Sequence, residues 1–219
     1  VSYDDFKDIK YDNSFPSKFN YNFMDISIIE TLKLQAENDL FELLDIIQKW
    51  DRKTDIDSQG AGIYGVLYYQ LVRNYRSEIQ KNNKTVSKEI LLSALSDTKA
   101  YIINNFGSIR ITLGDFQKLV RGDKELPIWG LPDVITAMSS RPYKDGKQKV
   151  TQGESYIGLV RFNENGPILE SIISFGNSDN PDSEHYTDQM EKYSKFQTKK
   201  MTFDKNIIYS QAKKIYNPN

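Results

Sequence analysis

The hydrophobic pattern of the chain changes its period once, and this change constrains the fold more than any other feature. Before Gly107 apolar side chains recur at helical intervals, and after it β-rich runs alternate with turn residues. Helices followed by strands, without regular alternation of the two, favour an α+β fold over a doubly wound parallel sheet. No repeat or long linker divides the chain. We therefore expect a single region, 1–219, mainly helical over 1–108 and mainly strands with a late helix over 109–219.

Three helices are predicted in the first half of the chain. The first ends near Trp50, and Asp57 or Ser58 could cap the second. The third is expected from about Thr85 to Asn105, with Gly107 stopping it. The apolar faces of these helices contain Leu40, Leu43, Leu44 and Ile47; Tyr64, Leu67, Tyr68, Leu71 and Tyr75; and Leu91, Leu95 and Ile102. Residues 1–22 are aromatic but aperiodic, which indicates extended or loop structure.

A β-hairpin is the clearest element of the second half. The runs "SYIGLVRF" (155–162) and "PILESIISF" (167–175) flank "NENG", in which Asn165-Gly166 is expected to supply the positive backbone angles of a tight turn. An earlier strand is predicted over 115–121, and a helix between residues 187 and 196. Residues 201–203 and 213–216 are weaker strand candidates.

Composition excludes several functional classes. Lys and Arg total 29 against 30 Asp and Glu, so the net charge of −1 argues against nucleic acid or an anionic membrane as the main partner. Without cysteine there is no disulfide, thiolate metal site or thiol nucleophile. No apolar run is long enough to span a membrane, and the polar, acidic stretch "VSYDDFKDIKYDNSFPSKF" does not have the character of a signal peptide.

The stretch "GNSDNPDSEHYTDQ" (176–189) contains the main candidate functional residues, among them the only histidine of the sequence, His185. One histidine cannot build a two- or three-histidine metal site, and no G-x-S-x-G motif presents a nucleophilic serine. A hydrogen-bonding or exposed role for His185 is favoured over catalysis. The oxygens of Asn177, Asp179, Asp182 and Glu184 resemble calcium ligands, but the EF-hand spacing is absent. An ordered loop leading into a helix is the favoured interpretation, and a calcium-dependent adhesive module stays open as an alternative.

Other motifs favour structural roles. Gly60-Ala61-Gly62 precedes a helix but lacks the P-loop Lys-Ser/Thr and a preceding strand, so Gly62 is expected to permit close helix packing. The pairs Lys199-Lys200 and Lys213-Lys214 are typical of solvated faces. Asn83-Lys84-Thr85 is a glycosylation sequon, relevant only where the source glycosylates. From the residues alone we assign no catalytic, cofactor-binding or metal-binding residue.

Several stretches, in order, resemble the end of the β chain in the penicillin acylase family of N-terminal nucleophile hydrolases. "LGDFQKLVRGDKELPIWGLPDVI" (113–135) is similar to its W-G-D-x-H-R segment followed by a Leu-Pro run. "GESYIGLVRFNENGPILESIISFGNSDNPDSEHYTDQ" is similar to G-x-S-Y, a hairpin and then G-x-S-x-x-P-x-S-x-H-Y-x-D-Q. "KKMTF" follows where the family has a short strand. "WDRKTDIDS" (50–58) is similar to W-(D/N)-x-x-x-x-x-D-S. The likeness is greatest to the acyl-homoserine-lactone acylase and aculeacin A acylase branch.

Two positions depart from that pattern. Leu113 stands where the family has Trp, and Gln117 stands where it has His. These departures put the acyl specificity in doubt. Within the motif itself, Ser178, Pro181, Ser183, His185, Tyr186, Asp188 and Gln189 keep the family register.

The resemblance implies a fold and an activity. The parent fold would be the αββα four-layer sandwich. The parent reaction would be the hydrolysis of an acyl-amide bond, such as that of an acyl-homoserine lactone or a penicillin. The parent enzyme would be a periplasmic or secreted bacterial hydrolase of antibiotic metabolism. The nucleophile would be the first residue of the β chain with its own α-amino group as base. Val1 cannot serve, and Ser2 would first require removal of Val1. We therefore expect a C-terminal segment that is inactive alone and needs no cofactor.

The resemblance also implies partners. The segment would bind the α chain and the N-terminal part of the β chain, and an isolated copy would expose a large apolar face. The rival hypothesis is a non-catalytic scaffold or binding domain that folds alone and has kept only the family scaffold. Solution behaviour distinguishes the two, because a free-standing domain stays monomeric and a separated part aggregates or co-purifies with partners.

Overall fold

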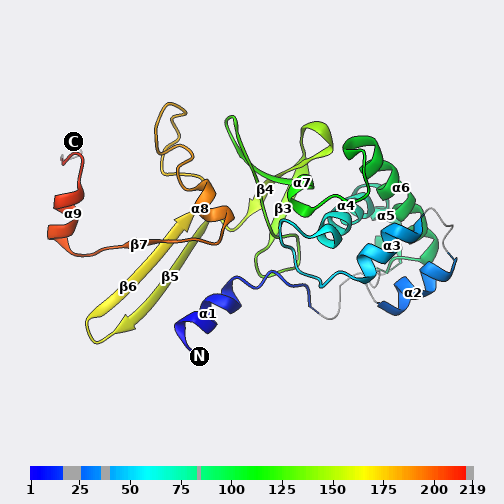
Figure 1. Ribbon diagram of the computed structural model, residues 1–219, viewed down its shortest axis with the longest axis horizontal. Helices are drawn as coiled ribbons and strands as arrows, with labels where there is room; N and C mark the ends of the chain where they lie inside the picture. The colour runs from blue at the N-terminus through cyan, green and yellow to red at the C-terminus, as the bar shows by residue number, and fades with distance from the viewer. Residues whose placement is uncertain (17–25, 36–39, 83–84, 216–219) are drawn as a thin grey trace. The chain divides into compact units, whose positions relative to one another are not determined.

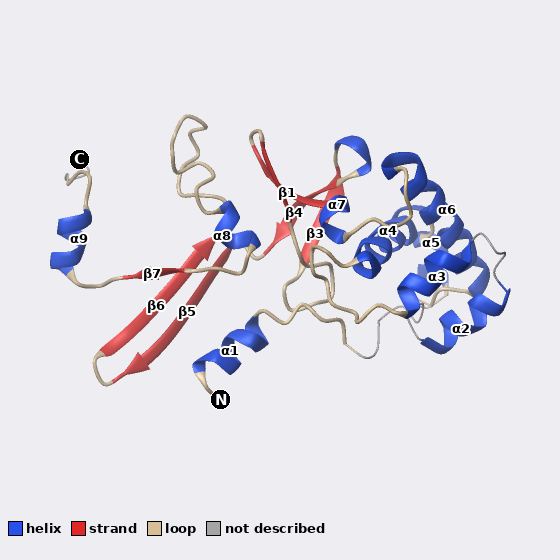
Figure 2. Ribbon diagram, in the orientation of Figure 1, coloured by secondary structure: helices blue, strands red, loops and turns tan. Residues whose placement is uncertain are grey.

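The computed structural model describes residues 1–16, 26–35, 40–82 and 85–215 (Figure 1). The chain divides into a larger compact unit, Asp4–Gly153, and a smaller one comprising Val1–Tyr3 and Glu154–Asn219. Helices and β-sheets occur in both units (Figure 2), which confirms the α+β class. That residues 1–219 act as a single region stays a prediction, and the sequon at 83–85 begins outside the described residues.

The larger unit begins with helices and continues with strands. Its helices are α1 (Tyr3–Lys10, of which Tyr3 belongs to the smaller unit), α2 (Ile26–Gln35), α3 (Phe41–Gln48), α4 (Gln59–Asn74), α5 (Arg76–Lys81), α6 (Lys88–Phe106) and α7 (Leu113–Phe116). Its strands are β1 (Gln117–Arg121), β2 (Lys124–Pro127), β3 (Met138–Pro142) and β4 (Gln148–Gly153), with the short 3-10 helix η2 (Lys144–Gly146) before β4.

Local capping residues set the ends of the long helices. The hydroxyl of Ser58 accepts the backbone N–H of Ala61 at the start of α4, so Ser58 and not Asp57 is the cap. Ser87 caps α6 in the same way, and Gly107 ends that helix in the left-handed conformation, with φ of 74°. These boundaries confirm two of the predicted helices to within a few residues, although α4 starts five positions before Tyr64, its first predicted apolar residue.

Helix α4 lies at the centre of the core and contacts α3, α6 and α7. A Cβ on Gly62 would lie 2.7 Å from the carbonyl carbon of Thr112, so this glycine permits the close approach expected of it. Aromatic rings extend along the same helix, where Tyr64 packs edge-on against Phe15 with ring centroids 5.0 Å apart. The core therefore belongs mostly to the helical part of the larger unit.

A four-stranded mixed sheet, in the order β2-β1-β4-β3, completes the larger unit. β1 pairs antiparallel with β2 and parallel with β4, and β3 pairs antiparallel with β4. The strand predicted over 115–121 starts later than expected, because Thr112 and Asp115 form a capping box that keeps Asp115 and Phe116 in α7. Strands β2, β3 and β4 were not predicted from the sequence.

The smaller unit is built on the predicted hairpin. β5 (Tyr156–Asn163) and β6 (Gly166–Ile173) pair antiparallel along their whole length, and β7 (Lys199–Met201) adds to β6. The turn itself consists of Glu164 and Asn165, between the paired residues Asn163 and Gly166. Only Gly166 has a positive φ, 104°, so the expectation that Asn165 would share this conformation is wrong. Helices α8 (Met190–Ser194) and α9 (Lys205–Gln211) follow.

Several weaker predictions need correction. Residues 3–10 form α1 instead of a loop, although this short helix buries none of its side chains. The helix expected over 187–196 is confined to α8, and Phe196 has a positive φ of 55° beyond its end. The strand expected at 201–203 lies at 199–201. Residues 213–215 form no strand, and Tyr216 is outside the described residues.

The three-stranded sheet buries apolar side chains on one face and leaves several apolar side chains of the other face exposed. Ile157, Leu159 and Ile172 are buried, as are Met190 and Tyr193 of α8. The opposite face carries Tyr156, Val160 and Phe162, whose exposures are 59%, 49% and 80%, and β7 adds Met201 at 44%. We call these four residues the apolar face. No helix in the described part of the chain is long and apolar enough to cross a membrane.

Candidate functional site

The loop of residues 176–189 connects β6 to α8, and its two ends are joined by hydrogen bonds. The backbone N–H of Gln189 donates to the carbonyl of Phe175 at 2.8 Å, and the side chain of Gln189 accepts the N–H of Ile173 at 3.3 Å. Inside this junction the backbone of Gly176 lies directly against the backbone of His185 on the other side of the loop. A Cβ on Gly176 would be 2.0 Å from the carbonyl oxygen of His185. The loop is therefore a closed, ordered structure.

Polar side chains within the loop bond mainly to its own backbone. Ser178 Oγ accepts the N–H of Asn180, and the Asn180 side-chain oxygen accepts the N–H of Asp182 at 3.0 Å. Ser183 Oγ likewise accepts the N–H of His185 at 3.2 Å. These are the turns that Asn, Asp and Ser build through side-chain bonds. The geometry agrees with an ordered loop that leads into a helix.

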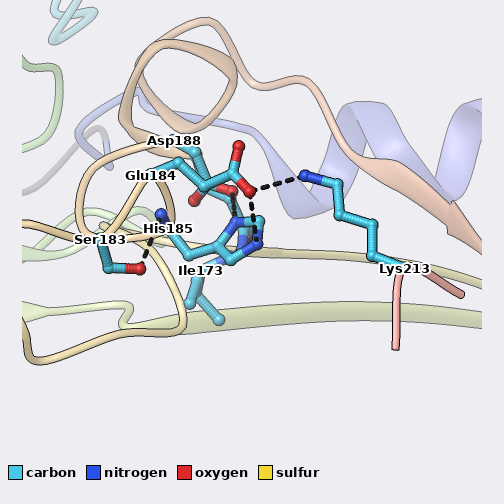
Figure 3. Close-up of polar contacts among 7 residues, drawn as sticks. Ile173, Ser183, Glu184, His185, Asp188 and Lys213 are labelled. Atoms are coloured by element: carbon cyan, nitrogen blue, oxygen red, sulfur yellow. Dashed lines mark hydrogen bonds and ion pairs between the residues drawn. The ribbon is translucent and has the colours of Figure 1, made fainter. Parts of the chain in front are cut away.

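His185 lies between two carboxylates (Figure 3). Its Nδ1 is 2.9 Å from Asp188 Oδ2, and its Nε2 is 3.7 Å from Glu184 Oε1. Lys213 Nζ donates to the same oxygen of Glu184 at 2.6 Å, and this bond lowers the pKa of the Glu184 carboxyl. The His185 side chain is 54% exposed, so these contacts are open to solvent.

The arrangement can orient an imidazole, but it lacks the other parts of a hydrolytic site. In the described loop the hydroxyl of Ser183 bonds to the backbone of His185 and not to its ring. Nor does any group of three His, Cys, Asp or Glu side chains in residues 1–16, 26–35, 40–82 and 85–215 have metal-binding geometry. Asn177, Asp179, Asp182 and Glu184 are thus not brought together as a calcium shell.

Gln117, one of the two departures from the family pattern, is fully buried at the start of β1. Its amide Nε2 donates to the carbonyl of Gly130 at 2.6 Å, and its Oε1 accepts the hydroxyl of Ser140 at 2.8 Å. The backbone N–H of Ser140 in turn donates to the Tyr69 hydroxyl at 2.7 Å, and burial raises the pKa of Tyr69. Gln117 therefore connects the segment after β2 to β3 and, through Ser140, to α4.

The segment 50–58 borders a solvent-open groove of about 530 Å³. Trp50 packs against Gly60 and donates its ring N–H to the carbonyl of Lys53 at 2.8 Å. Four of the groove's charged residues form two ion pairs: Arg110 with Glu42 at 2.6 Å and Lys49 with Asp45 at 2.7 Å. The bonds from Lys49 and then Lys33 lower the pKa of Asp45. These contacts join α3 to its neighbours, whereas the carboxylate of Asp51, also in the groove, accepts the backbone N–H of Lys53 at 3.0 Å.

Sequence reasoning missed the buried polar network of the larger unit. It singled out Gln117 only through the family comparison, and it did not find Tyr69, Ser140 or Gln148. Gln148 is fully buried and accepts a hydrogen bond from Arg73 at 2.5 Å. A glutamine in a strand of unknown register gives no signal of burial, because its face depends on pairing with distant strands.

Comparison with known proteins identifies relatives of this chain. The sequence profile of the penicillin amidase family matches residues 1–209. The acyl-homoserine lactone acylase PvdQ of Pseudomonas syringae pv. syringae is 39% identical over 98 residues, which is 43% of this chain and 13% of that enzyme. The corresponding acylase of Pseudomonas putida is 25% identical over 182 residues, which is 72% of this chain and 22% of that enzyme. The chain thus spans only a small part of the curated relatives it matches.

Among solved structures, a thermostable penicillin G acylase from Alcaligenes faecalis matches with a TM-score of 0.43 and 14% sequence identity. That match covers 95% of this chain and 48% of the acylase chain, and it is too slight to bear on function. The profile match over residues 1–209 is decisive by itself, because it includes nearly the whole sequence, with both units and the 176–189 loop. The chain belongs to the penicillin amidase family.

Proposed function

We propose that the chain is the C-terminal portion of the β subunit of a penicillin-amidase-type amidohydrolase. The parent enzyme hydrolyses an acyl-amide bond, such as that of an acyl-homoserine lactone or a penicillin. Its nucleophile is the N-terminal residue of the β chain, outside residues 1–219, and an oxyanion hole outside the segment stabilises the tetrahedral intermediate. The segment by itself is inactive.

The observation that carries this proposal is the 176–189 loop. It lies within the family match and retains the polar residues of the family motif. Yet its hydrogen bonds go mostly to its own backbone, and its histidine ring contacts carboxylates. A loop that orders itself in this way supports a scaffolding role late in the β chain, with the reacting groups supplied by another part of the enzyme.

The apolar face supports the proposed partners, which are the α chain and the N-terminal part of the β chain. The solvated face of an antiparallel sheet usually carries polar side chains, whereas here Phe162 is 80% exposed and Val160 49% exposed. Contiguous exposed apolar side chains mark interaction surfaces. A periplasmic or secreted location follows as part of the same proposal.

The test is intact-mass spectrometry with N-terminal sequencing of native material, followed by hydrolysis assays on acyl-homoserine lactones and penicillins. Additional chains, one of them beginning with Ser, Thr or Cys, are expected to co-purify, and only their complex should release the amine product. A single active species of 25.4 kDa would refute the proposal, as would a native complex that hydrolyses neither substrate class.

One observation favours the rival hypothesis of a non-catalytic domain. The larger unit has an apolar core of its own, with buried residues from Phe15 to Val134, as a domain that folds alone needs. A monomeric, soluble chain whose Phe162→Glu variant behaves identically would support a free-standing domain. Under the proposed function Phe162→Glu instead reduces self-association of the isolated chain, which size-exclusion chromatography with light scattering measures.

A further inference from the structure

The two faces of the four-stranded sheet in the larger unit differ in chemistry. One face carries Gln117 and Ser140, and it packs on α4 through the hydroxyl of Tyr69. Successive side chains along a strand point to opposite faces, so the residues next to Gln117 on β1 and next to Ser140 on β3 point to the other face. That side, which we call the basic face, carries Lys118 on β1, Arg141 on β3, Lys149 on β4 and Lys147 immediately before β4.

Three of these cations form a row across the sheet. Lys118 is the direct partner of Lys149 in the parallel β1–β4 pair, and Arg141 is the direct partner of Lys149 in the antiparallel β3–β4 pair. Paired residues point to the same face, and neighbouring strands lie about 4.8 Å apart. Like charges placed directly opposite one another destabilise a sheet, so this row costs the isolated chain stability.

The carboxylates that the structure describes form no ion pair with this row. Glu125 lies on the same face, but Lys147 at 2.8 Å and Lys144 at 3.2 Å share its carboxylate. The pKa of Lys118 is lowered by burial and then by the neighbouring Lys147, against the opposing influence of Glu125 and Asp115. Throughout the described ranges no acidic side chain forms an ion pair with Lys118, Arg141 or Lys149.

We propose that the basic face is an interaction surface for an acidic segment of a partner polypeptide, whose carboxylates lie along the row of Lys118, Lys149 and Arg141. A carboxylate fits because this face already holds one, that of Glu125, between two lysine ammonium groups. The inference does not depend on the enzymatic role proposed above.

The experiment measures binding of a fluorescein-labelled poly-L-glutamate peptide to the 219-residue chain by fluorescence anisotropy. The variant Lys118→Gln/Arg141→Gln/Lys149→Gln removes the row. Its affinity is expected to fall roughly tenfold, because three ion pairs of the strength usual at a protein surface are lost. Binding to the wild type is expected to weaken with added salt, because exposed charges are screened beyond about 10 Å at 0.1 M ionic strength.

The matched control is Arg76→Gln/Lys81→Gln/Lys88→Gln, which removes the same number of positive charges, but from α5 and α6. This control should leave the affinity unchanged. Circular dichroism checks that each variant is folded, and the exposed single variant Arg141→Gln gives the readout if the triple variant unfolds. Equal loss in both triple variants, or no loss in the first, would overturn the proposal. Tighter binding of inorganic polyphosphate or duplex DNA through the same three residues would also overturn it, in favour of a phosphate-bearing partner.

Discussion

Replacing Gln117 by leucine is expected to destabilise the larger unit by about 2–6 kcal/mol. Leucine fills a similar volume but can neither donate to the Gly130 carbonyl nor accept from the Ser140 hydroxyl. Each buried polar group that loses its partner costs about 1–3 kcal/mol. The loss is a large share of the roughly 5–15 kcal/mol that stabilises a typical domain.

Urea unfolding followed by tryptophan fluorescence measures this loss, because Trp50 and Trp129 both lie in the larger unit. Gln152→Leu, at an exposed position of β4, is the control and should change the free energy of unfolding by less than about 0.5 kcal/mol. An equal effect of the two substitutions would refute the argument, because the cost would then not come from the buried hydrogen bonds.

Gln117→His tests the same network through pH. A neutral imidazole can donate to the Gly130 carbonyl from one nitrogen and accept the Ser140 hydroxyl with the other, but an imidazolium can only donate. Burial and loss of the acceptor should place the folded-state pKa of this histidine below its unfolded value of about 6.5. The unfolded state then binds more protons, so the variant should lose stability relative to the wild type as the pH falls below about 6.5. A constant difference between pH 5 and 8 would show that the histidine is not part of the network.

Three further results are expected. Gly176→Ala should loosen the 176–189 loop, because its Cβ would lie 2.0 Å from the His185 carbonyl oxygen; faster amide exchange at residues 178 and 189 would show it, and unchanged exchange would contradict the packing. Tyr69→Phe should cost about 1–3 kcal/mol in urea unfolding, since a buried β3 N–H loses its acceptor. Because the pKa of Tyr69 is raised by burial, its contribution is present below pH 10 and lost as the pH rises further, and the phenylalanine variant should lack this dependence. Glu184→Gln should remove a small stabilisation that is present above about pH 4.5 and lost as the pH falls through the lowered pKa of Glu184. An NMR titration of the Glu184 carboxyl in the wild type should have its midpoint below pH 4.5, and a midpoint at or above that pH would count against the ion pair.

Local signals in the sequence were sufficient to predict several elements of the fold. Ser58 and Ser87 begin helices and Gly107 ends one, because capping depends on a few neighbouring residues. The hairpin of β5 and β6 was likewise predicted from two β-rich runs that flank a turn sequence, although the conformation of its turn was not. The family motif over 176–189 pointed to the loop, and its Asn and Ser content indicated the turns that the structure contains.

Tertiary structure alone decided how distant segments pair. β1 pairs in parallel with β4, although β2 and β3 lie between them in the sequence. This register buries Gln117 and Gln148, and it aligns Lys118, Lys149 and Arg141 on the other face. A shift of one residue would exchange those faces, and no local pattern fixes it. The burial of two glutamines and the assembly of a row of cations are therefore consequences of long-range strand pairing, whose free energy depends on contacts that sequence neighbours do not make.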